Sequence, residues 1–156
     1  MNHCGTCNAC CKVFEIPELT KPAGDWCKHC DVGVGCTIYD ARPEICRSFE
    51  CFWLISQSRE DPRERLAPDL RPDKSKVVLS PTTNENVIAA TTMPGSPLAY
   101  QRADVMLLIK TLSSGGMAVV CGPPRATRRV LFDKDGSHEV RLTEPDPETG
   151  MQYNVE

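Results

Sequence analysis

The sequence predicts a small α+β protein, in which an irregular cysteine-rich module packs on a small antiparallel sheet covered by one helix. Three observations lead to this fold class. Nine of the ten cysteines fall between Cys4 and Cys51, a charged segment broken by prolines follows, and from Val77 short apolar strands alternate with one helical stripe. At 156 residues we expect one domain, or one domain with a small module that needs an extra source of stability.

Residues 1–55 are expected to form the cysteine-rich module, with only short pieces of regular structure. Its one good helix candidate begins at Pro43, because the fixed φ and missing N–H of proline suit a first helical position. An apolar stripe with i, i+4, i+7 and i+8 spacing continues it: Ile45, Phe49, Phe52 and Trp53. At 3.6 residues per turn, Cys46 and Cys51 would point about 140° apart on one helix. Either this helix is interrupted or the two thiols serve different centres.

Residues 56–76 are charged and contain Pro62, Pro68 and Pro72. This composition predicts a solvated connector with one helical turn.

Residues 77–145 are expected to form a small α+β half. The predicted order is strand, strand, helix and strand, followed by a hairpin around the turn at residues 133–136. The helix is expected to start at Ser96 and Pro97, which suit an N-cap and a first turn, and to end at the glycines 115–116. The predicted strands cover residues 77–79, 87–91, 117–121, 129–132 and 139–142. Residues 146–156 are polar and are expected to form a flexible tail.

So dense a cluster of cysteines must supply disulfides, metal ligands or redox groups. Disulfides need an oxidising compartment, yet His3 and Cys4 come directly after the start and no apolar run suits an export signal or a membrane span. The cluster holds an odd number of cysteines, and the adjacent Cys10 and Cys11 have a poor geometry for a relaxed bridge. We therefore expect a cytoplasmic chain whose C-x-x-C pairs bind metal.

Nine thiols are candidate metal ligands: Cys4, Cys7, Cys10, Cys11, Cys27, Cys30, Cys36, Cys46 and Cys51. A C-x-x-C turn lets two sulfurs reach one ion while backbone N–H groups donate to them. Nine ligands exceed one tetrahedral site and predict two centres, although bridging sulfurs would also allow three ions. Adjacent side chains project in different directions, so Cys10 and Cys11 would more easily serve different centres, or one would bind while the other packs.

Zinc and an iron–sulfur cluster compete for these thiols. Zinc prefers tetrahedral thiolate sites. A [4Fe-4S] cluster suits a C-x2-C-x2-C run with a remote fourth cysteine, and Cys4, Cys7 and Cys10 match that run. The ferredoxin run ends in C-x3-C-P, however, whereas Cys11 follows Cys10 directly and no proline comes after it. The spacing favours Zn²⁺ and keeps the [4Fe-4S] cluster as the alternative.

Several short motifs carry a family resemblance: Cys4-x-x-Cys7-x-x-Cys10-Cys11-Lys12, Cys27-Lys28-His29-Cys30, Gly35-Cys36-Thr37-Ile38-Tyr39, Arg42-Pro43 and Cys46-Arg47-Ser48-Phe49-x-Cys51-x-Trp53. Together they resemble the CxxCxxCC family, also called the YkgJ-type cysteine-cluster family. They cover residues 4–54 densely, and residues 70–72 with the helix-bearing half more loosely. The resemblance implies a zinc- or iron-chelating domain. A related cysteine signature occurs in a flagellin lysine methylase, but nothing here resembles its methyl-donor site, so no reaction is implied.

Basic residues embedded in the cluster are expected to offset its negative charge, because a Zn(Cys)4 centre carries a formal charge of about −2. We assign this role to Arg42 and Arg47, whereas Lys12 and Lys28 suit it and an ordinary surface position equally well. His3 and His29 are expected beside the site or exposed, since thiols are already in surplus. Three aromatic side chains are expected to shelter the site from water: Trp26, Phe49 and Trp53.

The rest of the chain offers no catalytic set, P-loop or dinucleotide fingerprint, so we do not expect an enzyme. A net charge of −3 and a pI near 5.7 argue against binding to nucleic acid or anionic membranes. Cys121 is expected to be a buried apolar side chain. The basic run of residues 125–129 is expected to be a solvated loop. The predicted function is a metal-binding protein with a structural zinc module. The alternatives are an iron–sulfur redox or accessory protein, and a metal-stabilised adaptor for an unidentified protein partner.

Overall fold

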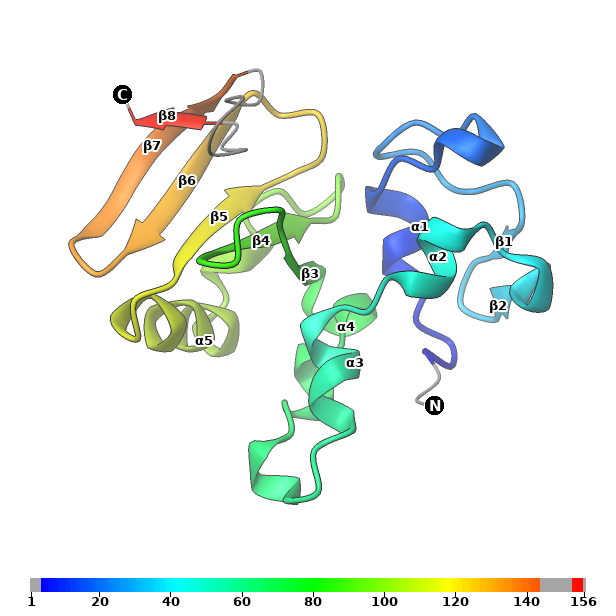
Figure 1. Cartoon of the computed structure of the whole chain (residues 1–156), viewed down its shortest axis with the longest axis horizontal. Coiled ribbons are helices and arrows are strands. Elements are labelled where there is room, and N and C mark those ends of the chain that lie inside the picture. Colours follow the sequence, from blue (N-terminus) through cyan, green and yellow to red (C-terminus); the bar gives the residue numbers. More distant parts are fainter. Residues whose placement is uncertain (1–3, 144–152, 156) are drawn as a thin grey trace.

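The computed structural model of the chain describes residues 4–143 and 153–155. A six-stranded sheet lies at one end of the molecule, the cysteine-rich module lies at the other, and short helices fill the space between them (Figure 1). The strands follow one another in chain order: β3 (Val77–Pro81), β4 (Val87–Thr92), β5 (Ala118–Gly122), β6 (Arg128–Asp133), β7 (Gly136–Leu142) and β8 (Tyr153–Val155). The protein is thus a mixed helix-and-sheet fold.

The sheet is mixed, which corrects the prediction of an antiparallel sheet. β4 and β5 run parallel, with Val87 opposite Ala118 and Thr91 opposite Gly122, while the other pairs are antiparallel. The cause is the connection between them, which contains helix α5 (Ala103–Ser114). A crossover through a helix returns the chain to the starting end of the sheet and so yields a parallel neighbour.

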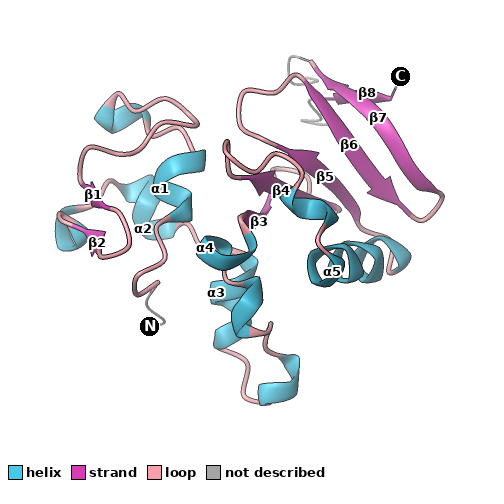
Figure 2. Ribbon diagram, turned by 180° about the vertical axis from the view of Figure 1, so that it is seen from behind, coloured by secondary structure: helices cyan, strands magenta, loops and turns pink. Residues whose placement is uncertain are grey.

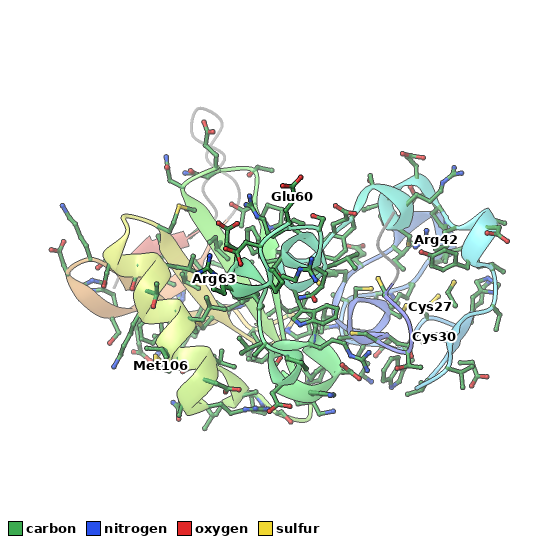
Figure 3. The ribbon with its side chains drawn as sticks, turned by 90° about the horizontal axis from the view of Figure 1, so that it is seen from below. Cys27, Cys30, Arg42, Glu60, Arg63 and Met106 are labelled. Carbon is green, nitrogen blue, oxygen red and sulfur yellow. The ribbon has the colours of Figure 1, made fainter. Side chains whose placement is uncertain are left out.

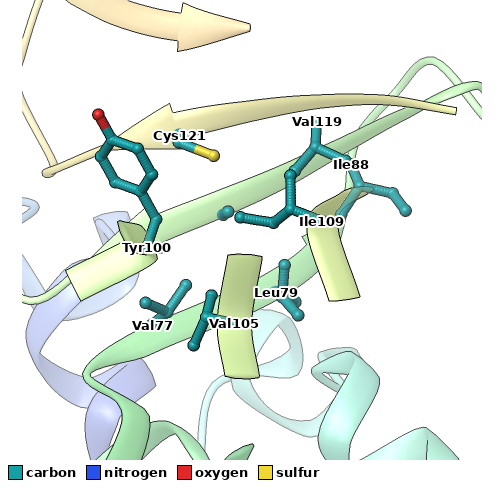
Figure 4. Close-up of a cluster of buried hydrophobic side chains, with 9 residues drawn as sticks. Val77, Leu79, Ile88, Tyr100, Val105, Ile109, Val119 and Cys121 are labelled. Atoms are coloured by element: carbon teal, nitrogen blue, oxygen red, sulfur yellow. The ribbon is translucent and has the colours of Figure 1, made fainter. Parts of the chain in front are cut away.

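Helix α5 covers one face of the sheet, as Figure 4 shows in close-up. Val105 and Ile109 are 1% and 0% exposed and pack against alternate side chains of the strands: Val77, Leu79, Ile88, Ala90, Val119 and Cys121. The burial predicted for Cys121 is confirmed, at 1% exposure. The helix starts later than predicted because a 3₁₀ turn, η5 (Ala99–Gln101), intervenes after Pro97. It ends at Gly115, as expected.

The connector holds more helix than the one turn predicted. It contains the end of α3 (Phe52–Gln57), two 3₁₀ turns, η3 (Pro62–Glu64) and η4 (Pro68–Leu70), and helix α4 (Pro72–Ser75). Proline occupies the first turn of the last three elements, where its missing N–H costs nothing. The prolines therefore start short helices here instead of only breaking them. Figure 2 shows α3 and α4 between the module and the sheet.

The cysteine-rich module is built from short elements, as predicted. They are α1 (Ala9–Val13), η1 (Pro17–Leu19), the two-stranded hairpin of β1 (Cys30–Asp31) and β2 (Gly35–Cys36), η2 (Tyr39–Ala41) and α2 (Glu44–Ser48). The helix expected from Pro43 to Trp53 is interrupted: α2 stops at Ser48, Phe49 and Cys51 are extended, and α3 begins after Cys51. The first of the two explanations for the spacing of Cys46 and Cys51 is confirmed.

The module packs on the edge strand β3. Val78 faces away from α5 and is buried with Ala9 and Val13 of α1. Phe14 and Phe49 pack on this cluster, with their ring centroids 4.8 Å apart. Both faces of β3 are thereby covered, one by α5 and the other by α1.

The flexible tail predicted for residues 146–156 lies mostly outside the described residues. The part that is described, Tyr153–Val155, forms β8 and pairs with β7, with Val155 opposite Val140. In the described part of the chain, no helix is long and apolar enough to cross a membrane.

Candidate metal centre

The nine cysteines of the module converge from separate segments, and all of them are free thiols. Seven of them line one cavity of about 930 Å³: Cys4, Cys7, Cys10, Cys11, Cys27, Cys36 and Cys46. The other two cysteines interact electrostatically with these thiols: Cys51 with Cys4, and Cys30 with Cys11. Figure 3 shows Cys27 and Cys30 beside α1, with Arg42 on the same side of the molecule. Cys121, in β5, belongs to the core under α5 instead.

A first group of thiols comprises Cys4, Cys7 and Cys51. Burial, together with the nearby sulfurs of Cys51 and Cys7, raises the pKa of Cys4 to about 11. Burial also raises the pKa of Cys7 and of Cys51. Backbone N–H groups counter this effect: those of Ala9 and Asp73 donate to the Cys7 sulfur, and those of Trp53 and Leu54 donate to Cys51 at the start of α3. These donors are the kind that stabilise thiolates in metal sites.

A second group comprises Cys11, Cys27, Cys30, Cys36 and Cys46. Cys30 and Cys36 face each other across the β1–β2 hairpin, and the N–H of Cys30 donates to the carbonyl of Cys27 at 3.0 Å, which closes the C-x-x-C turn. The N–H of Cys27 donates to the carbonyl of Cys11 at 3.1 Å and so holds this turn against α1. Burial and the charge of Cys11 raise the pKa of Cys30 to about 12. Burial and the sulfurs of this same group raise the pKa of Cys46.

Cys10 and Cys11 stand between the two groups. The Cys10 thiol donates a hydrogen bond to Cys11, which lowers the pKa of Cys11 to about 6 and, together with burial, raises that of Cys10. Beyond this bond, Cys10 interacts with Cys4 and Cys7, whereas Cys11 accepts a second hydrogen bond from Cys30. Cys11 also raises the pKa of Cys4, so the vicinal pair links the two groups, with Cys11 joined to the second group by a hydrogen bond.

The thiols are gathered but do not form closed coordination spheres. Across residues 4–143 and 153–155, no three Cys, His, Asp or Glu side chains are arranged to hold a metal ion. What fits a metal is the chemistry of the donors: soft sulfur ligands in excess of four, backbone N–H groups directed at two of them, and nearby cations.

Arg42 is one of these cations, as the sequence predicted. Its side chain lies over the ring of Tyr39 at 3.6 Å, and its Nε donates to the Tyr39 carbonyl at 2.8 Å. From this position its charge lowers the pKa of three thiols: Cys4, Cys11 and Cys46. Arg47 lies at the exposed surface in an ion pair with Glu44 at 3.3 Å, so the role expected for it beside the thiols is not supported.

Lys21 is a second cation, and the sequence analysis missed it. The residue is 5% exposed, and its Nζ donates to the backbone carbonyls of Lys12, Phe14 and Pro22. Its charge helps to lower the pKa of Cys11. Burial lowers the pKa of Lys21 itself, and the sulfurs of Cys27 and Cys11 partly offset this. No pattern in the sequence distinguishes this lysine from the surface ones.

The aromatic and histidine side chains agree with the predictions only in part. Phe49 packs over α1 as expected. Trp26 is 38% exposed and has the ammonium of Lys12 at 5.3 Å from its ring, so it does not shelter the thiols. Trp53 donates through Nε1 to the carbonyl of Ala67 in the connector at 3.2 Å. His29 is half-buried beside Cys30, and His3 lies outside the described residues.

Comparison of the chain with protein-family models, with curated proteins and with solved structures finds no match. The resemblance to the CxxCxxCC family therefore stays a prediction based on the cysteine motifs.

Proposed function

We propose that residues 4–51 bind metal ions at two neighbouring centres, with zinc as the metal and a mainly structural role. The observation that carries this proposal is the convergence of nine free thiols from separate segments into two adjoining groups. An ordinary core has no use for so many thiols at one place. Buried thiolates repel one another unless a cation lies among them.

The first centre would use four thiols, Cys4, Cys7, Cys10 and Cys51, which is the number of a closed zinc site. The second would draw four ligands from five thiols: Cys11, Cys27, Cys30, Cys36 and Cys46. The interactions of Cys10 with Cys4 and Cys7, and the hydrogen bond between Cys11 and Cys30, support this assignment. Arg42, Lys21 and the backbone N–H groups at Cys7 and Cys51 would offset the negative charge of the thiolates.

A structural role follows from how little else holds the module together. Between residues 4 and 51 only four apolar side chains are buried: Ala9, Val13, Ile16 and Cys27. The burial of so few apolar side chains offsets only a small part of the conformational entropy that the module loses on folding. The thiols would cross-link α1, the β1–β2 hairpin, α2 and the start of α3, so the free energy of metal binding would be folding free energy.

An iron–sulfur cluster is the second candidate, and the cavity between the thiols favours it. A volume of about 930 Å³ exceeds what single ions need, and apolar side chains such as Phe14, Ile38 and Phe49 line it beside the cysteines. Such a lining limits the access of water, and solvent exposure is one of the factors that set the reduction potential of a cluster.

Metal and sulfide analysis of protein purified without oxygen tests both candidates. The zinc proposal predicts about two zinc ions per chain and no acid-labile sulfide. A brown preparation that contains iron and sulfide would replace zinc with the cluster. A folded protein that contains no stoichiometric metal, and takes up neither zinc nor iron on reconstitution, would overturn both.

A further inference from the structure

A second cavity, of about 380 Å³, lies between the module and the face of the sheet that α5 leaves uncovered. Its apolar lining includes Val87 and Ala89 of β4, Val120 of β5 and Phe14 of the module. Two arginines, Arg125 and Arg129, line it as well. Figure 1 shows the β5–β6 loop, which carries Arg125, extending from the sheet toward the module. The volume lies in the range of small-molecule sites.

Arg129 is held at this cavity by the backbone. Its Nε donates to the carbonyl of Ala126 at 3.0 Å and its Nη1 to that of Gly122 at 3.3 Å. Within the described residues its Nη2 has no hydrogen-bond partner and its charge has no carboxylate partner. Burial lowers the pKa of this half-buried guanidinium, because its charge has lost part of its contact with water, and the sulfur of Cys121 offsets this in part.

Gly122 makes the position of Arg129 possible. A Cβ on Gly122 would lie 2.4 Å from Cδ of Arg129 and 3.2 Å from its Nε. No side chain fits there, so the absence of one at residue 122 lets the arginine lie across β5. Glycine at residue 122 therefore leaves room for the arginine side chain in this position, and no acidic group of the described chain pairs with its guanidinium.

Arg125 supplies a second positive charge beside the cavity. It has a left-handed backbone with φ of 65°, uncommon outside glycine, and forms an exposed ion pair with Asp25 at 3.2 Å. Glu15, which is exposed, is the one carboxylate among the side chains that line the cavity. Asp25 already pairs with Arg125, so Arg129 is the guanidinium of this cavity that lacks a carboxylate partner among the described residues. Guanidinium groups bind carboxylate and phosphate oxygens through paired N–H donors.

We propose that this cavity binds a small organic anion. Its carboxylate or phosphate group contacts Arg129 and Arg125, and its apolar body packs on Val87, Ala89 and Val120. The site is separate from the thiol cavity and does not depend on the identity of the metal.

Calorimetric titration of the full-length protein, as isolated with its metal, tests this proposal with four probes: phenyl phosphate, benzoate, benzyl alcohol and inorganic phosphate. At least one aromatic anion is expected to bind, and the comparison of phenyl phosphate with benzoate identifies the preferred anionic group. Benzyl alcohol and inorganic phosphate are expected to bind at least tenfold more weakly. Benzyl alcohol lacks the anionic group that the arginines would bind, and inorganic phosphate lacks the apolar ring. Equal binding of benzyl alcohol, equal binding of inorganic phosphate, or no binding of either aromatic anion would overturn the proposal.

A substitution on the β5–β6 loop and one at the first residue of β6 form a matched pair. Arg125→Gln removes a guanidinium from the cavity, whereas Arg128→Gln removes the same charge from an exposed residue that does not line it. We expect Arg125→Gln to weaken binding of the aromatic anion about tenfold and Arg128→Gln to leave it within about twofold, provided that near-ultraviolet circular dichroism shows both variants folded. Equal losses in both variants, or no loss in Arg125→Gln, would contradict the site.

Discussion

Cys10 and Cys11 are neighbours in α1 and a hydrogen bond joins their thiols, yet among the described residues only Cys11 forms a further thiol hydrogen bond, with Cys30 of the second group. Cys10 interacts with Cys4 and Cys7, and Cys11 accepts a hydrogen bond from Cys30. Successive side chains on a helix point about 100° apart, so one short helix can present a sulfur to each of two sites. This relationship is the basis for two centres instead of one.

Serine substitutions of this pair should have unequal effects. Cys10→Ser removes one of only four thiols at the first centre, so it should lose about one metal ion per chain. Cys11→Ser leaves four thiols at the second centre and should retain more metal. Elemental analysis of the purified variants measures this difference.

Cys121→Ser is the matched control for these variants, because Cys121 is buried in the core under α5 and away from the module. It should keep the full metal content and lose stability only modestly. Metal loss in Cys121→Ser, or identical losses in Cys10→Ser and Cys11→Ser, would contradict the assignment of ligands.

Metal affinity should rise with pH. Burial raises the pKa of Cys4 to about 11 and that of Cys30 to about 12, so both thiols are protonated at neutral pH and must release protons when they bind a cation. Each released proton makes the apparent affinity about tenfold higher per pH unit below the pKa of that thiol. Competition with a zinc chelator at pH 6.5 and 8.0 measures the slope. An affinity that does not change with pH would show that these thiols are not ligands.

Lys21→Met should destabilise the protein by roughly 2–4 kcal/mol, because it removes a buried ammonium and leaves the partly buried carbonyls that accept from Nζ without this donor. Lys28→Met, at an exposed position of the same module, is the matched control and should change stability by less than about 0.5 kcal/mol. Urea unfolding of both variants gives the comparison. A Lys21→Met variant as stable as Lys28→Met would mean that the buried ammonium is not needed.

The α5 face of the sheet allows a similar comparison. Ile109 is 0% exposed, and Ile109→Ala should cost about 2–5 kcal/mol through lost burial and the cavity left behind. Leu107 is 68% exposed on the same helix, so Leu107→Ala should cost much less. Thermal unfolding checks the order of the two variants, and a reversed order would place the wrong face of α5 on the sheet.

Local patterns in the sequence predicted β3 to β7 and α5, because a short apolar run marks a strand such as Val77–Pro81 and helical spacing of apolar residues marks Ala103–Ser114. The strand β8 was not predicted, since it lies in the segment expected to be a flexible tail. The parallel pairing of β4 with β5 could not be predicted in the same way, since it depends on where the crossover helix packs. The five-residue helix α1 is too short for its periodicity to be detected.

At the candidate site, the break between Cys46 and Cys51 was one of the two explanations that their spacing allowed. The nine cysteines remain predicted ligands. The burial of Lys21 was not predictable. It results from three carbonyls that only the folded loop brings together.

X-ray absorption at the zinc edge tests the central claim most directly, because it reports which atoms surround the metal. The account predicts about four sulfur ligands at about 2.3 Å around each zinc ion, with little or no nitrogen or oxygen. Cys121→Ser should leave this spectrum unchanged, and Cys7→Ser should reduce the amount of bound zinc. A zinc ion surrounded mainly by oxygen or nitrogen at about 2.0–2.2 Å would show that the thiols of the module do not hold the metal.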